Sequence, residues 1–177
     1  MYTIPVLLGA FLVSVFSIYI AKPIAVRIGL VDKPGGRKAH DAHVPLVGGL
    51  AIFLSVGLAW FIAPRLGLST INSVFAAAGG LLFFVGLIDD HRQLSVKLRF
   101  GAQIVAAGLL IYSNVVIVDA GYLFGDEPFA LGWFAIPLTV FATVGAINAL
   151  NMIDGMDGLA GSVSLVSFTL LTVVAFM

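Results

Sequence analysis

Apolar residues in this chain are grouped in long runs separated by short polar segments. Each run is close to the length of about 20 residues that an α-helix needs to cross the hydrocarbon core of a bilayer. The expected spans are residues 4–21, 46–63, 71–88, 100–118, 131–150 and 159–177. The pattern therefore predicts an all-α membrane protein, a polytopic bundle of about six transmembrane helices.

Two of the polar segments between these runs carry further structural signals. The longest, residues 22–45, contains the turn signal Pro34-Gly35-Gly36. In residues 119–130, short apolar stretches flank Gly125-Asp126-Glu127-Pro128, which predicts a small hairpin, expected on the periplasmic side.

Composition supports the membrane assignment. The 177 residues are 60% hydrophobic and 10% charged, whereas a soluble domain has about 45–50% and 25%. We therefore expect residues 1–177 to form a single transmembrane domain. The sequence contains no cysteine, which excludes disulfides and thiol chemistry. Its net charge is zero, and no nucleic-acid partner is expected.

The basic residues are distributed unequally between the two sides of the predicted bundle. With the N-terminus outside, the cytoplasmic loops are residues 22–45, 89–99 and 151–158. Eight of the nine basic residues then lie inside, and Arg65 alone lies outside. Cytoplasmic loops are enriched in Lys and Arg, so this orientation is predicted. The inside residues are Lys22, Arg27, Lys33, Arg37, Lys38, Arg92, Lys97 and Arg99.

Four polar side chains recur every three residues from the end of the fifth run onward: Asn148, Asn151, Asp154 and Asp157. Ionisable groups beside hydrocarbon are costly, so they are candidates for a functional site. The alternative is an ordinary polar turn between two spans.

A pair of adjacent aspartates, Asp89-Asp90, ends the third run, and Lys97 and Arg99 follow it closely. Two adjacent carboxylates repel each other unless a cation, either a divalent metal ion or a basic side chain, lies between them. The alternative is that both aspartates simply face water at the interface.

The first cytoplasmic loop carries a second set of candidate residues. Basic and imidazole side chains there suit phosphate oxygens, as do Lys97 and Arg99; they are Lys33, Arg37, Lys38, His40 and His43. The alternative is that these cations only fix the topology. A metal site on the two histidines is not expected, because neither thiols nor a carboxylate pair lie nearby.

These carboxylates and cations share one predicted membrane face. Oxygen ligands suit hard cations, which often bind through one or two carboxylates plus substrate phosphates. We therefore predict Mg²⁺- or Mn²⁺-assisted phosphoryl transfer between a lipid phosphate and a soluble nucleotide. Asp89, Asp90, Asp154 and Asp157 are the expected catalytic residues, with Asp89 and Asp90 as metal ligands.

The same motifs resemble those of the polyprenyl-phosphate N-acetylhexosamine-1-phosphate transferases. The resemblance runs from about Lys22 onward. It is carried by Asp32-Lys-Pro-Gly-Gly-Arg-Lys-Ala-His40, Pro45-Leu-Val-Gly-Gly49, Asp89-Asp90, Leu94-Ser-Val-Lys97 and Asn148-Ala-Leu-Asn-Met-Ile-Asp-Gly-Met-Asp-Gly158.

The resemblance implies a particular reaction and location. The most similar members move N-acetylglucosamine-1-phosphate from UDP-N-acetylglucosamine to undecaprenyl phosphate and release UMP. They start the lipid-linked glycans of O antigen and enterobacterial common antigen. The implied location is the bacterial inner membrane with the active face cytoplasmic, and a homodimer is an expected assembly. Asn148 and Asn151 would then help to bind substrate.

The chain departs from the family pattern in two respects. Gln93 stands where relatives often have a third acid. Members have about ten or eleven spans, so we expect these residues to be the N-terminal part of a longer transferase. Two alternatives remain open, a small membrane transporter subunit and an inactive truncated fragment. Transporter sites tend to lie near the bilayer midplane, whereas the acids here are predicted at span ends or in loops.

Overall fold

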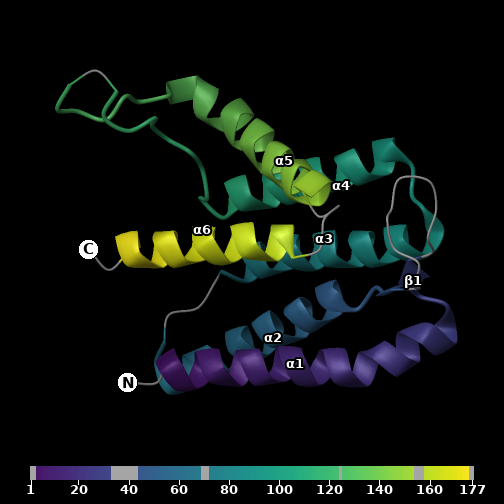
Figure 1. The fold of residues 1–177 in the computed structure, drawn as a ribbon. Helices are drawn as coiled ribbons and strands as arrows, with labels where there is room; N and C mark the ends of the chain where they lie inside the picture. Colours follow the sequence, from purple (N-terminus) through teal and green to yellow (C-terminus); the bar gives the residue numbers. More distant parts are fainter. Residues whose placement is uncertain (1–2, 33–43, 69–71, 124, 154–157, 176–177) are drawn as a thin grey trace. The chain divides into compact units, whose positions relative to one another are not determined.

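The structure is a computed structural model that describes residues 3–32, 44–68, 72–123, 125–153 and 158–175. Almost all of the regular structure in these residues is helical (Figure 1). The α-helices are α1 (Thr3–Ile28), α2 (Gly48–Ile62), α3 (Ser73–Arg92), α4 (Val96–Tyr112), α5 (Ala135–Ile153) and α6 (Leu159–Ala175). The 3₁₀ helices are η1 (Ala63–Leu66) and η2 (Gly132–Phe134), and the strands are β1 (Val31–Asp32) and β2 (Val44–Pro45).

Within the described residues, four helical segments are long and apolar enough to cross a membrane. They are Ile4–Ile28, Gly48–Leu66, Ser73–Arg92 and Gly132–Ile153. Large apolar side chains on them are exposed, with Phe11 at 64% and Phe141 at 76%, and an apolar surface of this extent suits contact with lipid. The prediction of an all-α polytopic membrane protein is confirmed.

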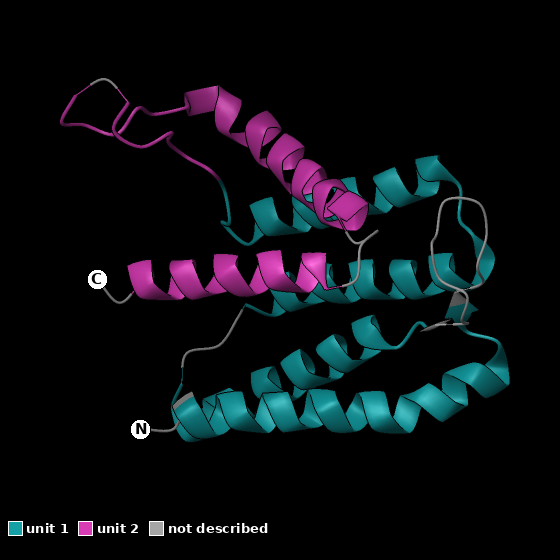
Figure 2. Cartoon of the chain, in the orientation of Figure 1, with its two compact units in different colours: residues 1–116 teal, residues 117–177 magenta. Residues whose placement is uncertain are grey.

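The chain divides into two compact units, residues 1–116 and residues 117–177 (Figure 2). In the first unit, α1 packs along α2 and α3 packs along α4. Aromatic rings join α2 to α3: Phe53 stacks on Phe83 with ring centroids 4.0 Å apart, and Phe84 meets Phe53 edge-on at 5.8 Å. Such pairs add about 0.5–1.5 kcal/mol beyond the burial of their area.

The two short strands close the base of the first polar segment. β1 and β2 pair antiparallel, with Val31 opposite Pro45 and Asp32 opposite Val44. The pairing continues at Leu46, whose N–H donates to the carbonyl of Leu30 at 3.1 Å. Asp32 and Val44 are therefore held together between α1 and α2.

The second unit contains the predicted hairpin and the helices α5 and α6. An antiparallel bridge joins Asp119 to Ala130, and the N–H of Ala120 donates to the carbonyl of Phe129 at 3.0 Å. The hairpin is tied to α5 by the buried Thr139, whose Oγ1 accepts a hydrogen bond from the N–H of Ile117 at 3.0 Å. This hydroxyl also donates to the carbonyl of Ala135 at 2.7 Å.

The helix ends differ from the predicted spans around the third and fourth runs. α3 continues to Arg92, so Asp89 and Asp90 lie in its last turns and not in a loop. α4 begins at Val96 and ends at Tyr112, whereas the predicted span was 100–118. Asn114, at φ 62°, takes the left-handed conformation just after α4, and this ends the helix although the following residues are apolar. Charged side chains do not end a helix; capping groups and left-handed residues do.

Candidate active site at the turn between α3 and α4

A tight connection of three residues joins α3 to α4 and holds the aspartate pair close to the basic residues. Gln93, after the last residue of α3, has φ 50° and ψ 76°, and its N–H donates to the carbonyl of Asp89 at 2.8 Å. Ser95 is the N-cap of α4, with its Oγ accepting from the N–H of Leu98 at 3.4 Å. A serine in this position satisfies a free N–H group of the first helical turn.

Asp89 is held at both of its carboxylate oxygens. Oδ1 accepts a hydrogen bond from the N–H of Leu94 at 2.7 Å, and Oδ2 accepts from the guanidinium of Arg99 at 3.1 Å. The side chains are 24% exposed for Asp89 and 37% exposed for Arg99. These two contacts fix the carboxylate between the end of α3 and the first turn of α4.

Asp90 lies in a different environment from its neighbour. Adjacent residues on a helix are rotated by about 100° and do not face each other. Asp90 is exposed, whereas Asp89 is half-buried against α4. The pair therefore offers one oriented carboxylate and one exposed carboxylate.

Two cations lie in the first turn of α4. Lys97 is exposed, and Arg99 makes the ion pair with Asp89. The N-terminus of a helix carries partial positive charge, so lysine and arginine there are unfavourable by a few tenths of a kcal/mol or more. Side chains whose charge is unfavourable for the local helix, as here, are typical of functional sites.

The two asparagines predicted from the sequence belong to the second unit. Asn148 and Asn151 lie in the last turns of α5, three residues apart and hence on one face. The Nδ2 of Asn148 donates to the carbonyl of Val144 at 2.8 Å, and Asn151 is exposed. The remaining predicted site residues lie outside the described residues: Lys33, Arg37, Lys38, His40, His43, Asp154 and Asp157.

The donor set for a metal ion can be tested on Asp89 and Asp90. In the described part of the chain, no group of three or more His, Asp or Glu side chains could hold a metal ion. Mg²⁺ often keeps several waters and binds through one or two carboxylates plus substrate phosphates. An ionised carboxylate offers about four acceptor positions, and the two contacts of Asp89 use one at each oxygen. The pair therefore fits the minimal protein contribution to such a site.

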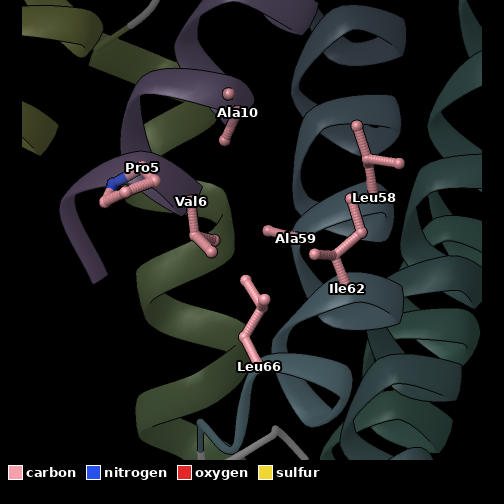
Figure 3. A pocket seen from close by; sticks show the side chains of 8 residues that line it. Pro5, Val6, Ala10, Leu58, Ala59, Ile62 and Leu66 are labelled. Atoms are coloured by element: carbon pink, nitrogen blue, oxygen red, sulfur yellow. The ribbon is translucent and has the colours of Figure 1, made fainter. Parts of the chain in front are cut away.

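A small apolar cavity in the first unit lies apart from these residues. It has a volume of about 130 Å³ between α1 and the C-terminal half of α2 with η1. Pro5, Val6 and Ala10 of α1 face Ala59 and Ile62 of α2 across it (Figure 3). No titratable side chain lines it, so it offers no chemistry for phosphoryl transfer.

The apolar helices, together with carboxylates and cations at the end of one helical hairpin, define an integral membrane protein with a polar site at a span end. A family model described as "Glycosyl transferase family 4" matches residues 71–177. The chain belongs to this family.

Curated relatives carry more specific names. The chain is 39% identical over 147 residues to an undecaprenyl-phosphate α-N-acetylglucosaminyl 1-phosphate transferase of Salmonella typhi, covering 80% of this chain and 38% of the relative. It is 38% identical over 143 residues to a probable undecaprenyl-phosphate N-acetylglucosaminyl 1-phosphate transferase of Bacillus subtilis, covering 78% and 40%. The chain thus spans about two-fifths of the length of these relatives. No solved structure matches the chain significantly.

Sequence reasoning placed Arg99 near the aspartate pair but missed the two groups that orient the turn. The N–H of Leu94 has no chemical signature in the sequence. A serine three residues before Leu98 was the available signal for a helix start at Val96. The hydrogen bond from the N–H of Leu94 to the carboxylate of Asp89 could not be predicted without knowing that Gln93 is left-handed.

Proposed function

We propose that this protein transfers N-acetylglucosamine-1-phosphate from UDP-N-acetylglucosamine to undecaprenyl phosphate at the cytoplasmic face of a bacterial inner membrane. UMP leaves, and the lipid-linked product starts a glycan of the O antigen or enterobacterial common antigen type. The observation that carries the proposal is the α3–α4 turn, where two carboxylates and two cations meet at a span end. The names of the curated relatives supply the sugar and the lipid.

In the proposed reaction, an oxygen of the lipid phosphate attacks the sugar-bearing phosphorus of UDP-N-acetylglucosamine. The bond from that phosphorus to the UMP oxygen breaks, and UMP leaves. A phosphate monoester has a second pKa near 6, so the nucleophile is largely a dianion at neutral pH. A strong general base is therefore not required, and the larger difficulty is bringing two polyanions together.

We assign separate roles to the two adjacent aspartates. Asp90 is exposed and is the carboxylate that faces metal and phosphates in our proposal. Asp89 contributes its remaining acceptor positions, while Arg99 and the N–H of Leu94 hold its orientation. Arg99 is thus a positioning residue as well as a candidate phosphate contact.

Lys97 is the cation that we assign to the phosphates at this turn. Its ammonium group is exposed, and it lies two residues from Arg99 in the first turn of α4. Lys33, Arg37, Lys38, His40 and His43 are proposed to add phosphate contacts from the segment between β1 and β2. A charge-assisted hydrogen bond contributes about 1.5–3 kcal/mol, so several of them are a substantial share of the binding of a diphosphate.

A divalent cation, Mg²⁺ or Mn²⁺, is the proposed cofactor. When bound, it would offset negative charge on the phosphates as they approach. Asp89 and Asp90 are its proposed protein ligands, and Asp154 and Asp157 are proposed to support the metal or the nucleotide. Asn148 and Asn151, on one face of α5, would orient these groups by hydrogen bonds.

A covalent aspartyl-phosphate route is the rival mechanism. It would leave a phosphorylated protein after mixing with UDP-N-acetylglucosamine when the lipid acceptor is withheld. Direct transfer leaves none, and this difference separates the two routes.

The proposed function is tested with the full-length protein in liposomes. UMP release from UDP-N-acetylglucosamine is measured with undecaprenyl phosphate, without it, and with Mg²⁺ removed by a chelator. We expect release only when lipid and metal are both present, and its loss in Asp90→Asn. UMP release that does not depend on the lipid, or that is as fast in Asp90→Asn as in wild type, would refute the proposal. A transporter subunit would instead move solute with no release of UMP.

A further inference from the structure

A second cleft in the first unit lies between the C-terminal ends of α1 and α3. It has a volume of about 520 Å³. Apolar side chains from both ends form most of its lining, and two nitrogen-bearing side chains complete it. The lining residues are Ile28, Leu30, Leu87, Ile88, His91 and Arg92. We call this space the α1–α3 cleft.

The α1–α3 cleft is open to the surroundings along its apolar wall. Ile28 is 61% exposed and Ile88 is 47% exposed, so the described side chains of the unit do not cover them. Leu30 is fixed beside them through its carbonyl, which accepts from the N–H of Leu46 in the β1–β2 connection. The apolar wall is therefore a preformed, exposed surface on which a hydrocarbon chain can lie.

The polar part of the lining follows from helix geometry. Leu87 and His91 are four residues apart, as are Ile88 and Arg92, so each pair stacks along one side of α3. Steps of about 100° per residue put these four side chains within a sector of about 140°. Each apolar side chain thus lies one turn from a nitrogen donor at the predicted cytoplasmic end of the span.

The carboxylates of the candidate active site lie on the other side of α3. With the same rotation per residue, Asp89 and Asp90 fall at about 200° and 300° from Leu87, outside the sector that lines the cleft. Neither is among the lining residues, and Asp89 is turned toward Arg99. A phosphate held by Arg92 and His91 would therefore lie on a different sector of α3 from the two carboxylates.

We infer that the α1–α3 cleft binds an anionic glycerophospholipid, with its phosphodiester on Arg92 and His91 and one acyl chain along Ile28, Leu30, Leu87 and Ile88. Basic pockets between transmembrane helices on the cytoplasmic side are suited to anionic head groups. Arg presents a planar set of donors that matches phosphate oxygens. The reacting monoester has to reach Asp89 and Asp90, which do not line the cleft, so we assign the cleft to a phosphodiester that does not react.

This site would be separate from the transfer reaction, so it can be tested without substrates. The purified full-length protein is titrated with phosphatidylglycerol and, separately, with zwitterionic phosphatidylcholine, and bound lipid is counted by native mass spectrometry. We expect wild type to retain phosphatidylglycerol in preference to phosphatidylcholine. Arg92→Gln should weaken phosphatidylglycerol binding about five- to tenfold, since a basic residue near an anionic lipid contributes about 1 kcal/mol or more.

Two further variants distinguish lipid binding in the cleft from a general attraction of anionic lipid to basic residues. Lys22→Gln removes a cation of the same predicted membrane face that does not line the cleft, and should bind phosphatidylglycerol as wild type does. Ile28→Trp keeps every charge but fills the apolar wall, and should weaken binding about as much as Arg92→Gln.

Four results would overturn the inference. Equal retention of the two phospholipids, or an equal loss in Lys22→Gln and Arg92→Gln, would mean that the cleft does not select an anionic head group. Wild-type binding in Ile28→Trp would mean that no acyl chain lies on the apolar wall. Displacement of phosphatidylglycerol by stoichiometric undecaprenyl phosphate, lost in Arg92→Gln, would assign the cleft to the acceptor lipid instead.

Discussion

The guanidinium of Arg99 lies 3.1 Å from Oδ2 of Asp89, ten residues earlier and on the preceding helix. An ion pair at this degree of exposure typically contributes only about 0–1 kcal/mol to stability. Its larger effect is directional, because together with the N–H of Leu94 it holds the carboxylate in one orientation. The pair therefore connects the α3–α4 turn to the geometry of the candidate active site.

Replacement of Arg99 should affect turnover far more than stability. Arg99→Gln is expected to lower kcat about tenfold to a hundredfold, because small misplacements of a catalytic group have effects of that size. The thermal unfolding midpoint should change little. Arg99→Lys should recover part of the rate, since it keeps the charge but loses the planar pair of donors.

A double-variant cycle separates positioning of Asp89 from direct phosphate binding by Arg99. If Arg99 acts through Asp89, then Arg99→Gln should cost little further activity in an Asp89→Asn background. Fully additive losses in kcat/KM would contradict the positioning role and favour an independent contact with phosphate.

The exposed aspartate should dominate the dependence on metal. Asp90→Asn is expected to abolish turnover at ordinary Mg²⁺ and to raise the Mg²⁺ concentration for half-maximal rate, because it removes a ligand charge. Asp89→Asn should lower kcat with a smaller shift in that concentration. Equal shifts in the two variants would argue against separate roles. A trapped phospho-enzyme that only Asp90→Asn loses would favour covalent transfer.

The lysine of the first turn of α4 offers a matched comparison with a lysine outside the site. Lys97→Gln should reduce kcat/KM for UDP-N-acetylglucosamine about tenfold to a hundredfold, the loss expected for one charge-assisted hydrogen bond. Lys22→Gln removes an equally charged and exposed side chain near the end of α1 and should change it little. Equal losses would mean that these cations act only through general charge.

Thr139 should matter for the stability of the second unit. Thr139→Val keeps the shape of the side chain but removes the Oγ1 that accepts from the N–H of Ile117, at a cost of about 1–3 kcal/mol. Thr169 is a matched control, since its hydroxyl also donates to a carbonyl four residues earlier but is exposed. Thr169→Val should be nearly neutral in denaturant unfolding. Equal effects would show that the contact with Ile117 adds nothing.

The predicted topology can be checked with introduced cysteines, because the chain has none. Val96→Cys, at the α3–α4 turn, and Ala120→Cys, in the hairpin, are both exposed positions. An impermeant thiol reagent added to intact cells should label Ala120→Cys, and Val96→Cys only after the membrane is opened. Labelling of both from one side would disprove the orientation derived from the basic residues.

The sequence alone was enough for the class of protein. Long apolar runs have one stable arrangement in hydrocarbon, because backbone groups there must be satisfied within a helix. The expected runs 4–21, 46–63, 71–88 and 131–150 accordingly lie within or largely overlap the four candidate spans. The small hairpin was also predictable, since Gly125 to Pro128 carry strong turn signals between apolar segments.

Helix ends and contacts needed the tertiary structure. Hydropathy placed Asp89 and Asp90 after a helix, but the helix ends where Gln93 turns left-handed, four residues later than expected. No pattern in the sequence distinguishes the half-buried Asp89 from the exposed Asp90, because their identity is the same and only their rotation about α3 differs. The contact from Arg99 likewise depends on α4 folding back along α3. Composition determines whether a segment enters the membrane, whereas the direction of each side chain depends on how neighbouring helices pack.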